Sequence, residues 1–166
     1  MSSRFDIDPS GQPAPPWITS AWLNSAVALQ PADLRGKVVV VHAFQMLCPA
    51  CVHHGLPQAQ RIQKLFSSQD VAVIGLHTVF EHHAAVTVVS LRAFVHENRI
   101  SFPVGVDAHQ AGSDGPIPLT MRAYGLQGTP SLLLIDRAGR LRRHCFGAED
   151  DLLVGAAIAT LLAEAD

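Results

Sequence analysis

Two cysteines, Cys48 and Cys51, are separated by two residues in the segment FQMLCPACVHH, and His53 and His54 follow them. These residue types at this spacing suit three chemistries: a redox-active dithiol, one half of a zinc site, or a peroxide-reducing centre. Each of these needs a thiolate, so a neighbouring group must lower the pKa of a cysteine. The surrounding elements decide which chemistry is favoured.

A strand and a helix flank the cysteines. The continuous β-branched run at residues 37–44 predicts a strand that is covered on both faces, as in a parallel sheet. From Pro49 onward the apolar residues recur at helical spacing, which predicts a helix that begins at the cysteines. The N-terminus of that helix offers N–H groups and the positive dipole end to Cys48, and Cys51 follows one turn later. We therefore expect Cys48 to attack a disulfide and Cys51 to resolve the mixed disulfide.

The rest of the chain supplies further strands and helices. The patterns predict strands at 71–78, 102–106, 131–135 and 141–146, helices near 88–95, at 119–124 and at 149–164, a loop at 107–118 and a hairpin turn at 136–140. The order βαβαβ followed by a hairpin predicts an α/β fold with a central mixed sheet and helices on both faces.

Composition limits the function classes. Hydrophobic residues make up 48% and charged residues 16% of the 166 residues, which is typical of one globular domain. The 12 Lys and Arg are balanced by 14 acids without a basic block, so we expect neither a nucleic acid nor a membrane as partner. Residues 1–16, rich in Pro, Gly and Ser, predict a flexible arm before a domain at 17–166. The absence of a signal-like or spanning segment and the odd cysteine count predict a cytoplasmic protein.

The segment Gly125-Leu126-Gln127-Gly128-Thr129-Pro130 precedes the strand predicted at 131–135. Together with Cys48-Pro49-Ala50-Cys51 at the start of a helix, it resembles the thioredoxin fold. The leading Leu34-Arg35-Gly36-Lys37 and the inserted helix and strand between 84 and 107 resemble the redoxin branch, which includes TlpA-type disulfide reductases and the AhpC/TSA peroxiredoxins. The resemblance implies that Thr129–Pro130 is a cis peptide facing the dithiol and that the Thr129 backbone pairs with a substrate.

Three residues are candidates for a proton relay. Where thioredoxins carry a buried Asp, six residues before the first cysteine, this chain has His42, which is either a proton acceptor for Cys51 or a neutral core histidine. Glu81 follows the strand at 71–78 on the same expected edge of the sheet, and it either relays a proton or begins a helix. His54, one turn beyond Cys51, is either part of the relay or a solvated surface residue.

Two other functions remain open. A zinc site would combine Cys48 and Cys51 with two of His53, His54, His82 and His83. A thiol peroxidase would use Cys48 as peroxidatic thiol, with Arg122 as a possible companion arginine. However, Gln45 and Val41 replace the Thr and Pro of that pattern, and without the Thr the match fails. Cys145 is expected to be a buried, inert thiol.

The best-supported reading is a thiol–disulfide oxidoreductase. It would need no cofactor or metal, because sulfur atoms carry the electrons. Its partners would be a disulfide-containing protein or small thiol and an external dithiol reductant. The sequence leaves the substrate and the direction of electron flow open.

Overall fold

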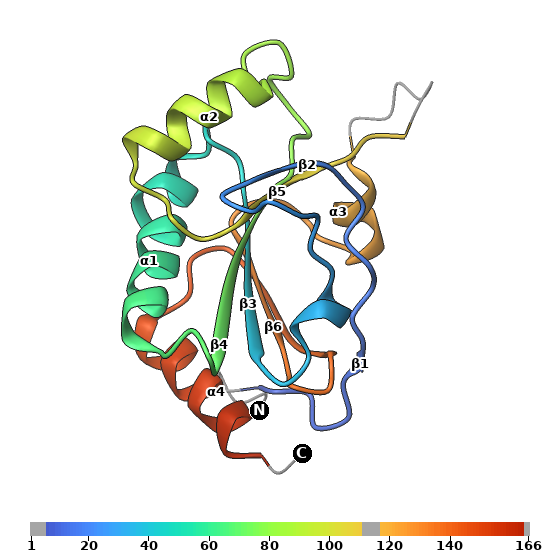
Figure 1. The fold of residues 1–166 in the computed structure, drawn as a ribbon, viewed down its shortest axis with the longest axis vertical. Helices are drawn as coiled ribbons and strands as arrows, with labels where there is room; N and C mark the ends of the chain where they lie inside the picture. Colours follow the sequence, from blue (N-terminus) through green and yellow to red (C-terminus); the bar gives the residue numbers. More distant parts are fainter. Residues whose placement is uncertain (1–5, 111–116, 165–166) are drawn as a thin grey trace.

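The β-branched run near residue 40 forms the central strand of a seven-stranded mixed sheet. The computed structural model describes residues 6–110 and 117–164. Figure 1 shows the sheet, whose strand order is β1-β7-β6-β3-β4-β5-β2. The strands are β1 (Gln12–Pro13), β2 (Thr19–Leu23), β3 (Val38–Phe44), β4 (Val71–His77), β5 (Val104–Asp107), β6 (Ser131–Ile135) and β7 (Arg140–Phe146). Strands β3, β4 and β5 are parallel, and the other pairings are antiparallel.

Helices cover both faces of the sheet. They are the 3₁₀ turn η1 (Pro31–Leu34), the π turn η2 (Cys51–Gly55), α1 (Leu56–Leu65), α2 (Val88–Glu97), α3 (Leu119–Ala123) and α4 (Asp151–Ala163). In Figure 1, α1, α2 and α4 lie on one side of the sheet and α3 lies on the other. Within the described residues, no helix is long and apolar enough to cross a membrane. The predicted thioredoxin-like α/β class with a mixed sheet and helices on both faces is confirmed.

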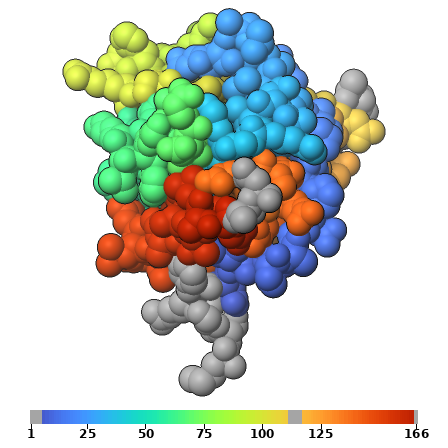
Figure 2. All heavy atoms as spheres, turned by 60° about the horizontal axis from the view of Figure 1, so that its bottom comes forward, coloured from blue at the N-terminus to red at the C-terminus, as the bar shows by residue number. Residues whose placement is uncertain are grey.

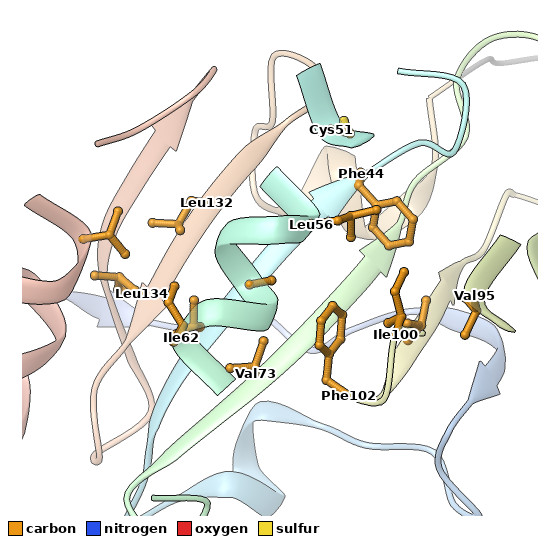
Figure 3. Packing of buried hydrophobic residues seen from close by; sticks show 14 of the residues in the cluster. Phe44, Cys51, Leu56, Ile62, Val73, Val95, Ile100, Phe102, Leu132 and Leu134 are labelled. Carbon is orange, nitrogen blue, oxygen red and sulfur yellow. The ribbon is translucent and has the colours of Figure 1, made fainter. Parts of the chain in front are cut away.

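The alternation of side chains along β3 divides the core into two clusters. Val38, Val40 and Phe44 face α1, α2 and α4, whereas Val39 and Val41 face α3. All seven residues of β3 are buried, as the continuous apolar run predicts for a strand covered on both faces. Figure 3 shows Cys51 at the end of the first cluster, next to the carboxyl end of β3. The Cys48–Cys51 segment therefore packs directly on the core.

Most predicted elements are found, with small shifts in their ends. The strand predicted at 102–106 begins at Val104, because Pro103 has no N–H with which to extend the ladder. In the loop predicted at 107–118, residues 111–116 lie outside the described residues. The structure adds three elements that the sequence reasoning missed: β1, β2 and η1.

The segment before residue 17 runs along the sheet edge. Its short strand β1 pairs with β7, and Asp8 N–H donates to the carbonyl of Arg142 at 2.8 Å. The Arg142 side chain also forms ion pairs with Asp136 and Glu164, which tie β7 to the end of α4. The flexibility of an arm at 1–16, and a domain boundary there, stay predictions.

Candidate active site

Cys48 and Cys51 lie where the chain leaves β3 and enters a helix. The helix begins at Pro49, as predicted, and Cys48 N–H donates to the carbonyl of Gln45 at 3.1 Å, which closes the preceding turn. The next turn is a π turn, in which Leu56 N–H donates to the carbonyl of Cys51. Pro57, in the first turn of α1, has no N–H to donate to the carbonyl of His53, and the helix is irregular just before it. Such turns widen a helix locally.

The two sulfurs occupy different environments. Both cysteines are free thiols; Cys48 is half-buried and Cys51 is fully buried. The backbone N–H of Cys51 donates to Cys48 Sγ at 3.2 Å. This contact places the outer sulfur at the N-terminus of the helix, within reach of a backbone donor. The geometry thus leaves Cys48 more accessible than Cys51, which lies directly behind it.

The inner thiol resists ionisation. Burial, together with the neighbouring Cys48 side chain, raises the pKa of Cys51 to about 12, while hydrogen bonds with the Gln45 backbone and the Thr129 side chain act in the opposite direction. Cys51 is therefore protonated at neutral pH. It must lose that proton when it attacks.

The Thr129–Pro130 peptide faces the cysteines and is cis. The Cys48 thiol donates to the Thr129 carbonyl, with 3.5 Å between Sγ and O. Pro130 also packs against the start of the helix. A Cβ atom on Gly55 would lie only 3.3 Å from Pro130 Cβ. The loop before β6, which the sequence associates with a substrate peptide, therefore borders the outer sulfur.

His42 lies in β3, on the face that carries Phe44 and Cys51. Its ring packs beneath the π turn: a Cβ on Gly55 would lie 3.6 Å from His42 Nδ1. The side chain is 2% exposed, and Nε2 has no hydrogen-bond partner among the described residues. Burial, and to a lesser extent His54, lowers the pKa of His42 to about 4. His42 is thus a neutral imidazole with a free nitrogen at neutral pH.

The other two relay candidates are placed differently. His54 is half-buried, and its Nε2 lies 2.8 Å from the carbonyl oxygen of Glu149, so it joins the helix start to the segment before α4. Glu81 is exposed and makes no hydrogen bond or ion pair with any residue of 6–110 or 117–164. Its loop is tied to the cysteine turn by Gln45, whose Oε1 accepts from Phe80 N–H at 3.2 Å. Roles for His54 and Glu81 in proton transfer stay predictions.

The sequence reasoning missed three features of the site. Gln45 is buried and braces the cysteine turn, which nothing in its local pattern shows. His77 is a second buried histidine, whose ring lies 5.1 Å from that of Phe44 and whose pKa is lowered by burial to about 4. Cys145, expected to be buried, is half-buried, with its sulfur 3.0 Å from Arg143 Nε.

Cys145 is nevertheless a poor nucleophile. Burial raises its pKa to about 11, and the nearby Arg143 guanidinium offsets this only in part. A thiol that stays protonated reacts slowly with disulfides. This is the chemical reason to treat Cys145 as separate from the dithiol.

The cysteines and histidines of the predicted zinc site do not lie together in an arrangement that could bind a metal ion. Within residues 6–110 and 117–164, no group of three or more His, Cys, Asp or Glu side chains is arranged to hold a metal ion. His54 is engaged with Glu149, while His53, His82 and His83 are exposed. Nor does the structure supply the missing peroxidatic groups, because Gln45 uses its side-chain oxygen to hold the Phe80 backbone and Arg122 is exposed on α3.

Comparisons with known proteins agree with this fold. A solved thioredoxin-like superfamily protein is 60% identical, with a TM-score of 0.88 over 92% of this chain and 97% of that chain. A thiol-disulfide isomerase from Corynebacterium glutamicum is 49% identical, with a TM-score of 0.86 over 92% of this chain and 98% of that chain. The thiol:disulfide interchange protein DsbE of Pseudomonas aeruginosa is 28% identical over 152 residues, 87% of this chain and 74% of that protein. The model of the AhpC/TSA family matches residues 10–144, so the chain belongs to this family of thioredoxin-like redoxins.

Proposed function

We propose that this protein is a TlpA-type thiol–disulfide oxidoreductase that works through Cys48-Pro49-Ala50-Cys51. One observation carries the proposal: the Cys51 N–H donates to the sulfur of Cys48, which is half-buried, while the Cys51 thiol is fully buried behind it. An accessible thiolate with an adjacent resolving thiol is what disulfide exchange requires. The names of the similar proteins, a thiol-disulfide isomerase and a thiol:disulfide interchange protein, support the same chemistry.

The proposed cycle has two exchange steps. The Cys48 thiolate attacks one sulfur of a substrate disulfide; a new S–S bond forms, and the other substrate sulfur leaves as a thiolate that takes up a proton. Cys51 then gives up its proton and attacks Cys48 Sγ, which forms the Cys48–Cys51 disulfide and releases the second substrate thiol. The substrate has gained two electrons and two protons. An external dithiol returns the protein to its reduced form.

His42 is the proposed proton acceptor for the second step. It is neutral, and its ring packs against Gly55, one turn beyond Cys51. A pKa of about 12 for Cys51 and about 4 for His42 disfavours complete transfer before attack. We therefore propose that the proton moves as the S–S bond forms, as in general base catalysis.

The proposed substrates are disulfides of proteins or small thiols, reduced by this protein. The Thr129 backbone would pair with the chain next to the substrate cysteine, and the rim around Cys48 includes the exposed side chains Leu47 (54%) and Phe146 (57%). Phe146 lies against Gly128, where a Cβ would come within 2.9 Å of its ring. The proposal also includes a cytoplasmic location and a reaction that needs no cofactor.

Trapping of the mixed disulfide tests the proposal. In a Cys145→Ser background, the further Cys51→Ser change should let a model peptide disulfide accumulate as a covalent adduct, detected by its mass. The further Cys48→Ser change should abolish both adduct and turnover. Peptide reduction at the parent rate without Cys48, or rapid hydroperoxide consumption by the parent protein, would reject this function in favour of another thiol or a peroxidase.

A further inference from the structure

A hollow lies between α2 and the end of β2. It encloses about 690 Å³ and is lined by residues of the segments 22–25 and 92–101. These segments precede the start of β5, which runs parallel to β3, so the hollow lies away from the carboxyl ends of the strands where the cysteines are. Figure 2 shows the chain near residue 25, in blue, beside the chain near residue 100, in yellow-green. We call this hollow the α2–β2 groove.

The α2–β2 groove is lined by basic and neutral side chains only. Arg92, His96 and Arg99 are all exposed along it, and no Asp or Glu is among its lining residues. Neither guanidinium has an ion pair or side-chain hydrogen bond with any residue in the described ranges. The whole chain has a formal net charge of −2, so this groove is a positive region on a slightly acidic protein. Such a local field attracts an anionic ligand.

The walls of the groove are held in place before any ligand arrives. Asn24 Nδ2 donates to the carbonyls of Ile100 at 2.8 Å and Phe102 at 3.1 Å. Gln60 Nε2 donates to the carbonyls of Asn98 at 3.0 Å and Arg99 at 3.3 Å. A wall fixed by four hydrogen bonds loses little conformational entropy on binding.

The strand beside the groove has a free edge. β2 is the last strand in the sheet order and pairs only with β5 among the described strands. An extended chain can add to such an edge through main-chain hydrogen bonds. Arginine forks bind carboxylates in a bidentate manner, and two arginines spread along the groove match several carboxylates better than one. We propose that the α2–β2 groove docks an extended acidic segment of a partner polypeptide, which lies along β2 with its carboxylates against Arg92 and Arg99.

Binding of a fluorescent peptide of alternating Glu and Thr, without cysteine, tests this site. Fluorescence anisotropy should show binding that weakens as salt rises, and a Gln-for-Glu peptide should bind at least about tenfold more weakly. The double variant Arg92→Gln/Arg99→Gln should lose at least about tenfold in affinity for the Glu peptide. The variant Arg35→Gln/Lys64→Gln removes the same charge at exposed sites elsewhere and should bind as the parent does.

Three results would overturn the proposal: no binding of the Glu peptide, an equal loss in both double variants, or tight binding of inorganic tripolyphosphate while the peptide fails to bind. Hydrogen exchange supplies an independent measurement. Backbone amides of β2 should gain protection when the peptide binds, and binding without this protection would contradict docking along the strand. Because the peptide has no thiol or disulfide, its binding should survive Cys48→Ser, and failure here leaves the oxidoreductase proposal untouched.

Discussion

At the scale of single residues, the proposed reaction depends on two thiols that lie in different environments. Cys48 receives the Cys51 N–H and is open to a partner, whereas burial raises the pKa of Cys51 to about 12. The second exchange step therefore begins with a protonated sulfur, which must lose its proton before or during the attack. The proposed base for that step is the neutral imidazole of His42, which packs against the π turn and has a nitrogen without a hydrogen-bond partner among the described residues.

Replacing His42 should slow the second exchange step and leave the first unchanged. In His42→Gln, release of the second thiol from a preformed Cys48 mixed disulfide should be at least about tenfold slower, because general base assistance is lost. Stopped-flow measurement of both steps checks this. His77→Gln removes another buried, neutral histidine from the same face of the sheet and serves as the control. Equal rates of release in His42→Gln and the parent would remove His42 from the mechanism.

At the scale of elements, the site depends on how closely the helix start approaches the sheet. Gly55 lies in the π turn between His42 and Pro130. A Cβ atom on this residue would lie 3.6 Å from His42 Nδ1 and 3.3 Å from Pro130 Cβ, so the absence of a side chain permits the close approach. A larger residue would push the turn away from the cis-proline loop. A glycine inside a helix lowers its stability, so close packing is the physical reason for this one.

Two glycine-to-alanine substitutions should have opposite effects on stability. Gly55→Ala should lower the free energy of unfolding by about 1 kcal/mol, since crowding against Pro130 outweighs the gain in helix propensity. Gly155 lies in α4, and a Cβ atom at this position would have no neighbour within 4 Å. Gly155→Ala should therefore raise the free energy of unfolding by about 0.5–1 kcal/mol, because alanine favours the helix and restricts the unfolded chain. Urea denaturation measures both, and stabilisation of equal size in the two variants would refute the close packing of the π turn.

At the scale of the whole molecule, the two buried histidines couple folding to pH. Burial lowers the pKa of both His42 and His77 from 6.5 to about 4, so between these values the unfolded chain binds more protons than the folded one. Stability contributed by the neutral rings is complete above the unfolded pKa and is lost as pH falls toward the folded pKa. Most carboxylates titrate below this window, which separates the two effects.

Lowering the pH from about 7.5 to about 5 should therefore cost roughly 2 kcal/mol of unfolding free energy per histidine. Urea denaturation at the two pH values should show a loss of roughly 4 kcal/mol in the parent and about half of that in His42→Gln or His77→Gln. A parent protein whose stability is the same at both pH values would contradict burial of two neutral histidines.

The sequence predicted what local patterns dictate and missed what distant contacts create. The strand at 38–44 and the helix at the cysteines follow from a continuous apolar run and from helical spacing. Strand β2 has no such pattern; it forms because it pairs with β5, where Trp22 packs over Gly105. The brace from Gln45 to Phe80 and the half-exposure of Cys145 likewise depend on residues far apart in the chain.

An equilibrium redox titration of Cys48 and Cys51 in dithiothreitol buffers, followed by thiol alkylation and mass measurement, tests the central claim most directly. Protein with Cys145→Ser should show one reversible transition in which both cysteines change together, with the slope of a two-electron couple. The same midpoint should be found with Cys145 present, because burial keeps that thiol protonated. The absence of a reversible Cys48–Cys51 disulfide, or a transition that requires Cys145, would contradict the dithiol mechanism.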